Sequence, residues 1–253
     1  MIELKSEREL AIMRKACSIV AETLDGLHKV IRPKVKTIEL DQFCEWLIKK
    51  RGGRPAFKNY KGFPANICTS INEVIVHGIP GNRTLHNGDI ISVDVGVEVE
   101  GYFGDGAFTY AVGTIDEESK RLIEVTKVAL EKGIENACVG KRISAISCTI
   151  QRFVESNGFN VIRAFVGHGI GSKLHEPPEI PNFGTPDTGV RLESGMVLAI
   201  EPMVSRGKYE IEILEDGWTA VTLDRSWVAH FEHTVVITDD GPEVLTLCQK
   251  RNP

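Results

Sequence analysis

The chain has 253 residues, of which 42% are hydrophobic and 26% charged, a balance typical of a folded globular protein rather than a disordered or fibrous one. Thirty-five acidic and thirty basic residues give a net charge of −5, which argues against nucleic-acid binding through a broad basic face. No apolar run approaches the roughly 18 residues of a membrane span, and the N-terminus lacks the apolar segment of a signal peptide. We therefore expect a cytoplasmic protein that binds neither a membrane nor a specific nucleic acid.

Two helices followed by strands are predicted for the first half. A capping box formed by Ser6 and Glu9 opens the first helix, in which apolar residues recur at steps of three and four up to about residue 31. The second helix is expected between residues 37 and 53, where two glycines can end it. From 65 to 112 the chain is rich in β-branched and aromatic residues, which predicts a run of antiparallel strands.

The same order begins again in the second half. Helical patterns extend from residue 116 to about 139 and from 144 to 156, and strand-like segments follow from 161 to 247. No low-complexity linker separates the two halves, which are about 1–115 and 116–253. We therefore expect one domain with internal pseudo-symmetry.

A weak internal repeat supports this interpretation. A shift of 107 residues aligns LHNGDIISVDVG (85–96) with LESGMVLAIEPM (192–203) and places Asp94 over Glu201. The identities are few, but the repeated order of helices and strands agrees with an ancient duplication. The prediction is an α+β domain over residues 1–253, with two pseudo-symmetric halves around a central antiparallel sheet.

Single acidic residues stand inside three apolar, strand-like segments: Asp94 in ISVDVG, Glu201 in MVLAIEPM and Glu232 in FEHTVVI. A lone carboxylate there costs several kcal/mol to desolvate unless it is paired or bound to a metal. One such acid would be assigned to the open face of a half-buried strand, but three of them favour a shared polar site. Asp105 in GYFGDGAF and His168 in VGHGIG have small neighbours that let an ion approach, although turn residues would show the same pattern.

Together these four carboxylates and one imidazole predict a metal centre. Two divalent cations balance four negative charges, whereas one cation would leave repulsion that raises the carboxyl pKa values. Oxygen-rich coordination with one imidazole suits Mn, Fe, Co or Zn in a pair about 3.5–4 Å apart. Glycine-rich phosphate loops, G-x-S-x-G and H-E-x-x-H are absent from the sequence, so these rival motifs are not supported.

Several short segments resemble, in order and spacing, the signature of the type I methionine aminopeptidases of the bacterial short form, in peptidase family M24. They are DVG (94–96), GD (104–105), GHGIG (167–171) with HEPP (175–178), IEPM (200–203) and FEHT (231–234). The resemblance covers nearly the whole chain and implies the pita-bread fold, in which both halves supply ligands to a central pair of metal ions. By this resemblance Asp105 and Glu232 bridge two divalent cations. Asp94 would hold one of them, and His168 with Glu201 the other.

The resemblance also implies substrate contacts. His77 in NEVIVHGIP would lie near the scissile amide, and His175 would polarise the carbonyl and stabilise the oxyanion. Without the resemblance, each would be interpreted as a loop histidine bonded to the backbone. Glu201 would also relay a proton to the leaving nitrogen. A methionine pocket is implied at residues that would otherwise be assigned to the core: Phe57, Tyr60, Phe63, Cys68, Leu174 and Trp218.

The implied activity is removal of the N-terminal methionine from nascent proteins when the second residue is small. A monomer that associates transiently with ribosomes is expected. Three positions depart from the family pattern: Leu174 where Phe is common, Phe103 where His is common, and His230 where Gln often precedes FEHT. These departures bear on substrate breadth and metal preference rather than on the ligands themselves.

Two alternatives stay open at this point. One is an X-Pro dipeptidase or aminopeptidase P of the same fold, which can share the five ligands but usually carries an extra N-terminal domain. The other is a non-catalytic pita-bread module that binds peptides or ribosomes. Such modules typically lose ligands, whereas all five are present here.

Overall fold

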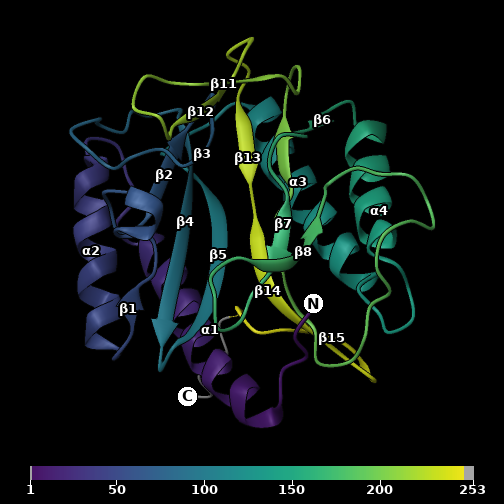
Figure 1. The fold of residues 1–253 in the computed structure, drawn as a ribbon. Helices are drawn as coiled ribbons and strands as arrows, with labels where there is room; N and C mark the ends of the chain where they lie inside the picture. Colours follow the sequence, from purple (N-terminus) through teal and green to yellow (C-terminus); the bar gives the residue numbers. More distant parts are fainter. Residues whose placement is uncertain (1, 248–253) are drawn as a thin grey trace, which may run out of the picture.

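A computed structural model describes residues 2–247 of the chain (Figure 1). The helices are α1 (Glu7–Leu27), α2 (Thr37–Lys50), α3 (Glu117–Glu135) and α4 (Ile143–Ser156), with a short 3₁₀ helix at Tyr60–Gly62. The strands are β1 (Arg54–Pro55), β2 (Cys68–Ile71), β3 (Val74–Val76), β4 (Ile90–Val99), β5 (Tyr102–Ala111), β6 (Asn160–Val161), β7 (Gly167–Gly169), β8 (Glu176–Ile180), β9 (Val197–Ile200), β10 (Met203–Ser205), β11 (Ile211–Ile213), β12 (Ala220–Thr222), β13 (Val228–His230), β14 (Glu232–Thr238) and β15 (Gly241–Val244).

The four predicted helices are present, but two of them are shorter than expected. The α1 helix begins after the predicted capping box, in which Ser6 donates to Glu9 from both its backbone nitrogen and its hydroxyl. It ends at Leu27 rather than near residue 31, because the last turn tightens into i→i−3 bonds such as the one from Val30 N to Leu27 O. The α3 helix ends at Glu135 for the same reason, since apolar spacing does not distinguish such a turn from an α-helix. No helix within residues 2–247 is long and apolar enough to cross a membrane.

One antiparallel sheet joins the two halves of the chain. Its strand order is β1-β4-β5-β14-β9-β7-β8, with β2 on β4 and β15 on β14. The β5–β14 pairing is the seam, flanked by β4 from the first half and β9 from the second. The two segments of the predicted repeat lead into β4 and β9, which lie on opposite sides of this seam. The predicted α+β class with a central antiparallel sheet is therefore confirmed, while the exact boundary near residue 115 stays a prediction.

The helices cover one face of this sheet. Helices α1 and α2 pack on the β4–β5 side, and α3 and α4 pack on the side of the second half (Figure 1). Along β4, the alternate residues Ile91, Val93 and Val95 enter the core formed with α1 and α2. Because side chains alternate along a strand, Asp94 points to the opposite face. The position of the helices thus decides on which face a polar site can form.

Candidate active site

A cavity of about 290 Å³ lies against this opposite face of the sheet, and every residue predicted for the site lines it. The acids and histidines among them are Asp94, Asp105, His168, Glu201, Glu232, His77 and His175. The residues predicted for the methionine pocket are Phe57, Tyr60, Phe63, Cys68, Leu174 and Trp218. Segments from both halves of the sequence therefore meet at one place.

Strand register brings three of the acids together. Asp94 on β4 lies opposite Ala107 on β5, and Ala107 lies opposite Glu232 on β14. Residues directly opposite each other project to the same face, and Asp105, two residues before Ala107, shares it. The small Ala107 side chain leaves room for carboxylates above it. Asp105 is thus a buried strand residue and not a turn aspartate.

The second half contributes through β7, β9 and β14. His168 on β7 lies opposite Ala199 on β9, which in turn lies opposite Thr234 on β14. Thr234 exchanges two hydrogen bonds with the backbone of Asp105: its hydroxyl accepts from Asp105 N at 3.0 Å and donates to Asp105 O at 2.7 Å. These bonds fix the Asp105 backbone across the seam between the two halves.

Three of the groups form a compact, buried cluster. One ligand atom each of Asp105, His168 and Glu232 lies within 4.8 Å of the others, and these residues are only 4%, 8% and 2% exposed. Glu201 follows β9 directly, and its two carboxylate oxygens lie 3.7 Å from Nε2 of His168 and 3.7 Å from Nε2 of His230. Such a spacing leaves room for an ion among the side chains.

Burial raises the pKa of all four carboxyls, and repulsion between carboxylates adds to the effect in three of them. Burial raises the pKa of Asp105 to about 7. Burial also raises the pKa of Asp94, Glu201 and Glu232 well above the ordinary range, and the negative charge of Asp105 adds to the effect in each case. Four carboxylates so close together need a compensating positive charge if all are to be ionised at neutral pH.

The imidazole of His168 is prepared as a neutral ligand. Burial lowers the pKa of His168 to about 4, so the ring carries no charge at neutral pH. Its Nδ1 lies 2.9 Å from the carbonyl oxygen of Gly169, which can only accept, so Nδ1 carries the proton and donates. The lone pair is therefore on Nε2, the atom that faces Glu201.

These residues fit a divalent metal. Buried Asp94 Oδ1 and Glu232 Oε1 have no hydrogen-bond partner among residues 2–247, although unpaired buried carboxylate oxygens are costly. Several carboxylate oxygens with one neutral imidazole nitrogen form a donor set that suits Mn, Fe, Co or Zn. A bound cation would satisfy the unpartnered oxygens and balance their charge.

Two further histidines lie on the cavity walls. The ring of His175, just before β8, is centred 4.2 Å from the ring of His168, and its Nδ1 lies 2.9 Å from the hydroxyl of Tyr60. His77 has a left-handed backbone conformation (φ 60°) that residues other than glycine rarely adopt. Its ring meets Phe165 and Trp218 edge to face, with centroids 5.4 and 6.2 Å away.

Five lining residues were not predicted: Lys61, Val76, Ala164, Phe165 and Val166. The strand-like segments expected from residue 161 onward do not include 162–166, because the chain leaves β6 at Val161 and forms part of the cavity wall before β7 begins. The position of this stretch directly before the glycine-rich GHGIG segment is the signal in the sequence that could have indicated its role.

The three departures from the family pattern also surround the site. Leu174 is 1% exposed and packs in the same apolar cluster as Phe57 and Phe63. Phe103 packs against this cluster, and its backbone nitrogen donates to Gly171 O at 2.9 Å. His230 is buried, and its Nε2 lies 3.7 Å from a carboxylate oxygen of Glu201. Their effect on specificity stays a prediction.

Comparison with known proteins agrees with the geometry. The model of metallopeptidase family M24 matches residues 11–239. The methionine aminopeptidase of Clostridium acetobutylicum is 53% identical over 250 residues, which are 98% of this chain and 100% of that protein. Methionine aminopeptidase 1 of Bacillus subtilis is 53% identical over 246 residues, 97% of this chain and 99% of that protein.

Solved structures give the same picture. The crystal structure of methionine aminopeptidase from Thermotoga maritima has a TM-score of 0.97 at 49% identity, covering 98% of this chain and 100% of that one. The prolidase of Pyrococcus horikoshii has a TM-score of 0.79 at 24% identity and is covered over 64% of its length, so it shares the fold alone. The fold and the two relatives agree, and the chain belongs to metallopeptidase family M24, among its type I methionine aminopeptidases.

Proposed function

We propose that this protein is a dinuclear metal aminopeptidase that removes the N-terminal methionine from nascent proteins whose second residue is small. The observation that carries the proposal is the convergence of five ligand-type side chains from both halves on one cavity with an apolar wall. The names of the two relatives support methionine as the residue removed. The X-Pro peptidase alternative is not favoured, since the likeness to prolidase extends to the fold alone.

Two cations are proposed because four carboxylates must be balanced. Their ligands would be Asp94, Asp105, His168, Glu201 and Glu232, and Co, Fe, Mn or Zn fits this donor set. When bound, such cations supply an activated water at neutral pH and Lewis-acid polarisation of a carbonyl. The side chains of the protein would carry the proton and bind the substrate.

Proton movement is assigned to Glu201. Burial raises the pKa of Glu201, which favours proton uptake by its carboxyl, and in this proposal the carboxyl carries a proton to the leaving nitrogen. His230 Nε2 lies 3.7 Å from the second oxygen of the same carboxylate. Glu201 thus serves as a ligand and as the proton carrier in this proposal.

His175 is assigned to the carbonyl oxygen of the substrate. Loss of hydration at the cavity wall, with smaller contributions from nearby Lys61 and histidines, lowers the pKa of His175 to about 3, so its ring is neutral. When the Tyr60 hydroxyl donates to Nδ1, the ring proton lies on Nε2 and can be donated to the developing oxyanion. Tyr60 therefore sets the tautomer that this role requires.

The apolar wall is assigned to the methionine side chain. Phe57, Phe63 and Leu174 are buried, and Trp218 packs edge to face on Phe63 with ring centroids 5.2 Å apart. Aromatic and aliphatic groups suit a flexible, polarisable thioether. We further propose that the part of the cavity beyond this wall admits only small side chains at the second residue.

The test is peptide hydrolysis by the metal-loaded protein. We expect release of methionine from Met-Ala-Ser, no release from an otherwise identical Met-Lys-Ser peptide, and no cleavage of X-Pro substrates. Cleavage of X-Pro peptides would support the alternative enzyme. Binding of Met-Ala-Ser without cleavage at full metal occupancy would support the non-catalytic module.

His77 is expected to act on the substrate and not on the metal. Replacing His77 with alanine should lower kcat by about 10²-fold, the typical effect of losing one polar contact to the transition state. Metal content, measured by elemental analysis, should stay that of the unaltered protein, because His77 meets Phe165 and Trp218 rather than the carboxylates. His86→Ala, at an exposed histidine, is the control. Stoichiometric loss of metal in His77→Ala would instead make His77 a ligand.

The expected cytoplasmic location, monomeric state and transient association with ribosomes stay predictions. Sedimentation of the purified protein, alone and mixed with ribosomes, measures the last two directly.

A further inference from the structure

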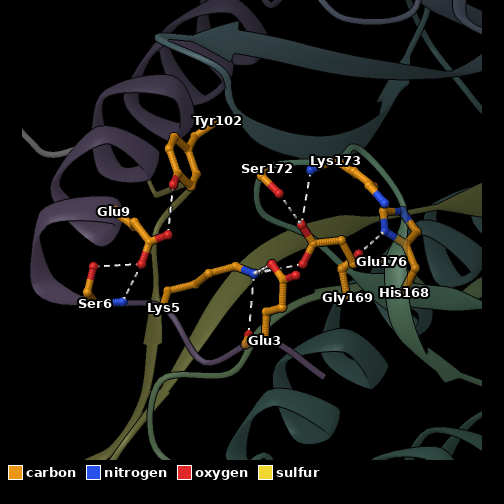
Figure 2. Close-up of polar contacts among 10 residues, drawn as sticks. All are labelled: Glu3, Lys5, Ser6, Glu9, Tyr102, His168, Gly169, Ser172, Lys173 and Glu176. Atoms are coloured by element: carbon orange, nitrogen blue, oxygen red, sulfur yellow. Dashed lines mark hydrogen bonds and ion pairs between the residues drawn. The ribbon is translucent and has the colours of Figure 1, made fainter. Parts of the chain in front are cut away.

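A buried ion pair links the N-terminal segment to the turn that carries His175. Lys5 Nζ lies 2.7 Å from Glu176 Oε2, and the two side chains are only 2% and 8% exposed. Glu176 follows His175 directly and begins β8, whereas Lys5 precedes α1 by two residues. Figure 2 shows the Lys5 side chain extending from the N-terminal segment to the Glu176 carboxylate. Neither residue of the pair has a part in the proposed chemistry, yet Glu176 lies next to His175, which does.

The lysine end of this pair is held firmly. Lys5 N donates to Gly195 O at 2.8 Å, which fixes its backbone on the second half of the chain. The next residue, Ser6, belongs to the capping box of α1. The Tyr102 hydroxyl on β5 donates to Glu9 Oε1 of the same box at 2.7 Å (Figure 2). Lys5 therefore projects from a segment anchored to both halves of the sheet.

The glutamate end organises the turn. Glu176 Oε1 accepts hydrogen bonds from Lys173 N at 3.0 Å and from the Ser172 hydroxyl at 3.3 Å, while Oε2 accepts from Lys5. Gly171 crosses directly over the lysine, where a Cβ would overlap Lys5 Cε. The turn between β7 and β8 thus surrounds the ammonium group of Lys5. The Glu176 carboxylate, at the end of the turn, holds Ser172 and Lys173 near its start.

His168 and His175, on either side of the turn between β7 and β8, are held in place by different contacts. His168 lies in β7, which pairs with β8 on one side and with β9 on the other. His175 lies at the end of the turn, outside the strands, and its position depends on the turn and on its contact with Tyr60. Disturbing the turn should therefore move His175 and leave His168 in place.

We propose that Lys5 is a positioning residue for His175, acting through its buried ion pair with Glu176. The proposal rests on the role of His175 in the proposed function. Removing the ammonium group leaves Glu176 as an uncompensated buried charge, which is far less favourable than either the intact pair or a neutral pair. The carboxylate then turns toward water and releases the bonds that shape residues 171–175.

The test compares Lys5→Met, which keeps the length of the side chain and removes its charge, with Lys15→Met. Lys15 lies on α1 and forms an exposed ion pair with Glu100, so it is a matched control. With Mn²⁺-loaded protein and Met-Ala-Ser, we expect Lys5→Met to lower kcat by about 10–10²-fold with KM within about threefold. Mn²⁺ affinity measured by calorimetry should be unchanged, and Lys15→Met should match the unaltered protein in every measurement.

The position of the ring is measured independently of activity. NMR correlations of the imidazole protons of His175 with the Tyr60 ring should be present in the unaltered protein and absent in Lys5→Met. Adding Glu176→Gln to Lys5→Met removes the unpaired charge and should recover part of kcat and of the NMR contact. If Lys5→Met does not fold, Glu176→Gln alone replaces it in the same comparison.

Two outcomes would overturn the proposal. One is a Lys5→Met protein that retains kcat and the contact of His175 with Tyr60. The other is a loss of kcat that merely follows a loss of Mn²⁺ affinity or of folded protein, since that indicates a general structural role. An unaltered protein that does not cleave Met-Ala-Ser would contradict the proposed function instead, and the NMR comparison would still decide whether Lys5 positions His175.

Discussion

Replacing Glu201 with alanine will abolish measurable turnover, with kcat reduced by about 10³-fold or more, and will weaken metal binding. The substitution removes the proposed proton carrier, worth about 10²–10⁴-fold, and a ligand-type oxygen 3.7 Å from His168 Nε2. Stopped assays with Met-Ala-Ser at saturating Mn²⁺ measure the first effect, and calorimetric titration of the metal-free protein measures the second.

Glu193→Ala is the matched control for this experiment. Glu193 is exposed in the turn before β9, the strand that leads to Glu201, and contributes no side chain to the cavity. It should leave kcat and metal affinity unchanged. Near-normal turnover by Glu201→Ala at full metal occupancy would contradict both roles assigned to Glu201.

The acids of the candidate site could be predicted because each is an unusual residue for its own short segment of sequence. Asp94 and Glu232 stand among apolar residues of their own strands, so the cost of burying them is visible without knowing their neighbours. Asp105 was ambiguous between strand and turn, and only its pairing opposite Gly96 in β4 decides the matter. The helical spacing of apolar residues and the strand-like composition also indicated where the helices and strands lie, which is why the fold class could be predicted.

Contacts between residues distant in the sequence could not be predicted in this way. Gly96 in the DVG segment has no room for a side chain because Phe57 lies against it. A side chain at Gly104 would collide with Cys17, because a Cβ there would lie 2.8 Å from the backbone nitrogen of Cys17. The pair of Lys5 and Glu176 joins residues 171 positions apart, and no local pattern marks it. Such contacts depend on how the two halves meet.

Metal binding is expected to release protons, which makes metal affinity rise with pH. Without a cation, burial raises the pKa of Asp105 to about 7 and raises the pKa of Glu232 well above its ordinary range, so these carboxyls keep their protons to higher pH than exposed carboxyls do. Burial lowers the pKa of His168 to about 4, so this ligand has no proton to lose. Calorimetric titration with Mn²⁺ at pH 7, in two buffers of different ionisation enthalpy, should reveal release of about one proton or more.

Whereas metal affinity should rise with pH, the stability of the metal-free protein should fall as pH rises. A carboxyl whose folded pKa is raised contributes stability that is complete below its unfolded pKa and is lost as pH rises through the folded value. The lowered pKa values of His168 and His175 act in the opposite sense, but only below about pH 6.5, the unfolded histidine value. Above pH 6.5 the carboxyls dominate, so the Tm of the metal-free protein should fall between pH 6.5 and 8.

Saturating Mn²⁺ should abolish this fall, because a cation that replaces the protons removes the repulsion among the carboxylates. Thermal unfolding followed by circular dichroism, with and without Mn²⁺ at each pH, measures the difference, which should widen as pH rises. A metal-free Tm that is constant or rises across this range, together with titrations that release no protons, would mean that the carboxyls are already ionised without a cation. The electrostatic basis of the metal centre would then have to be abandoned.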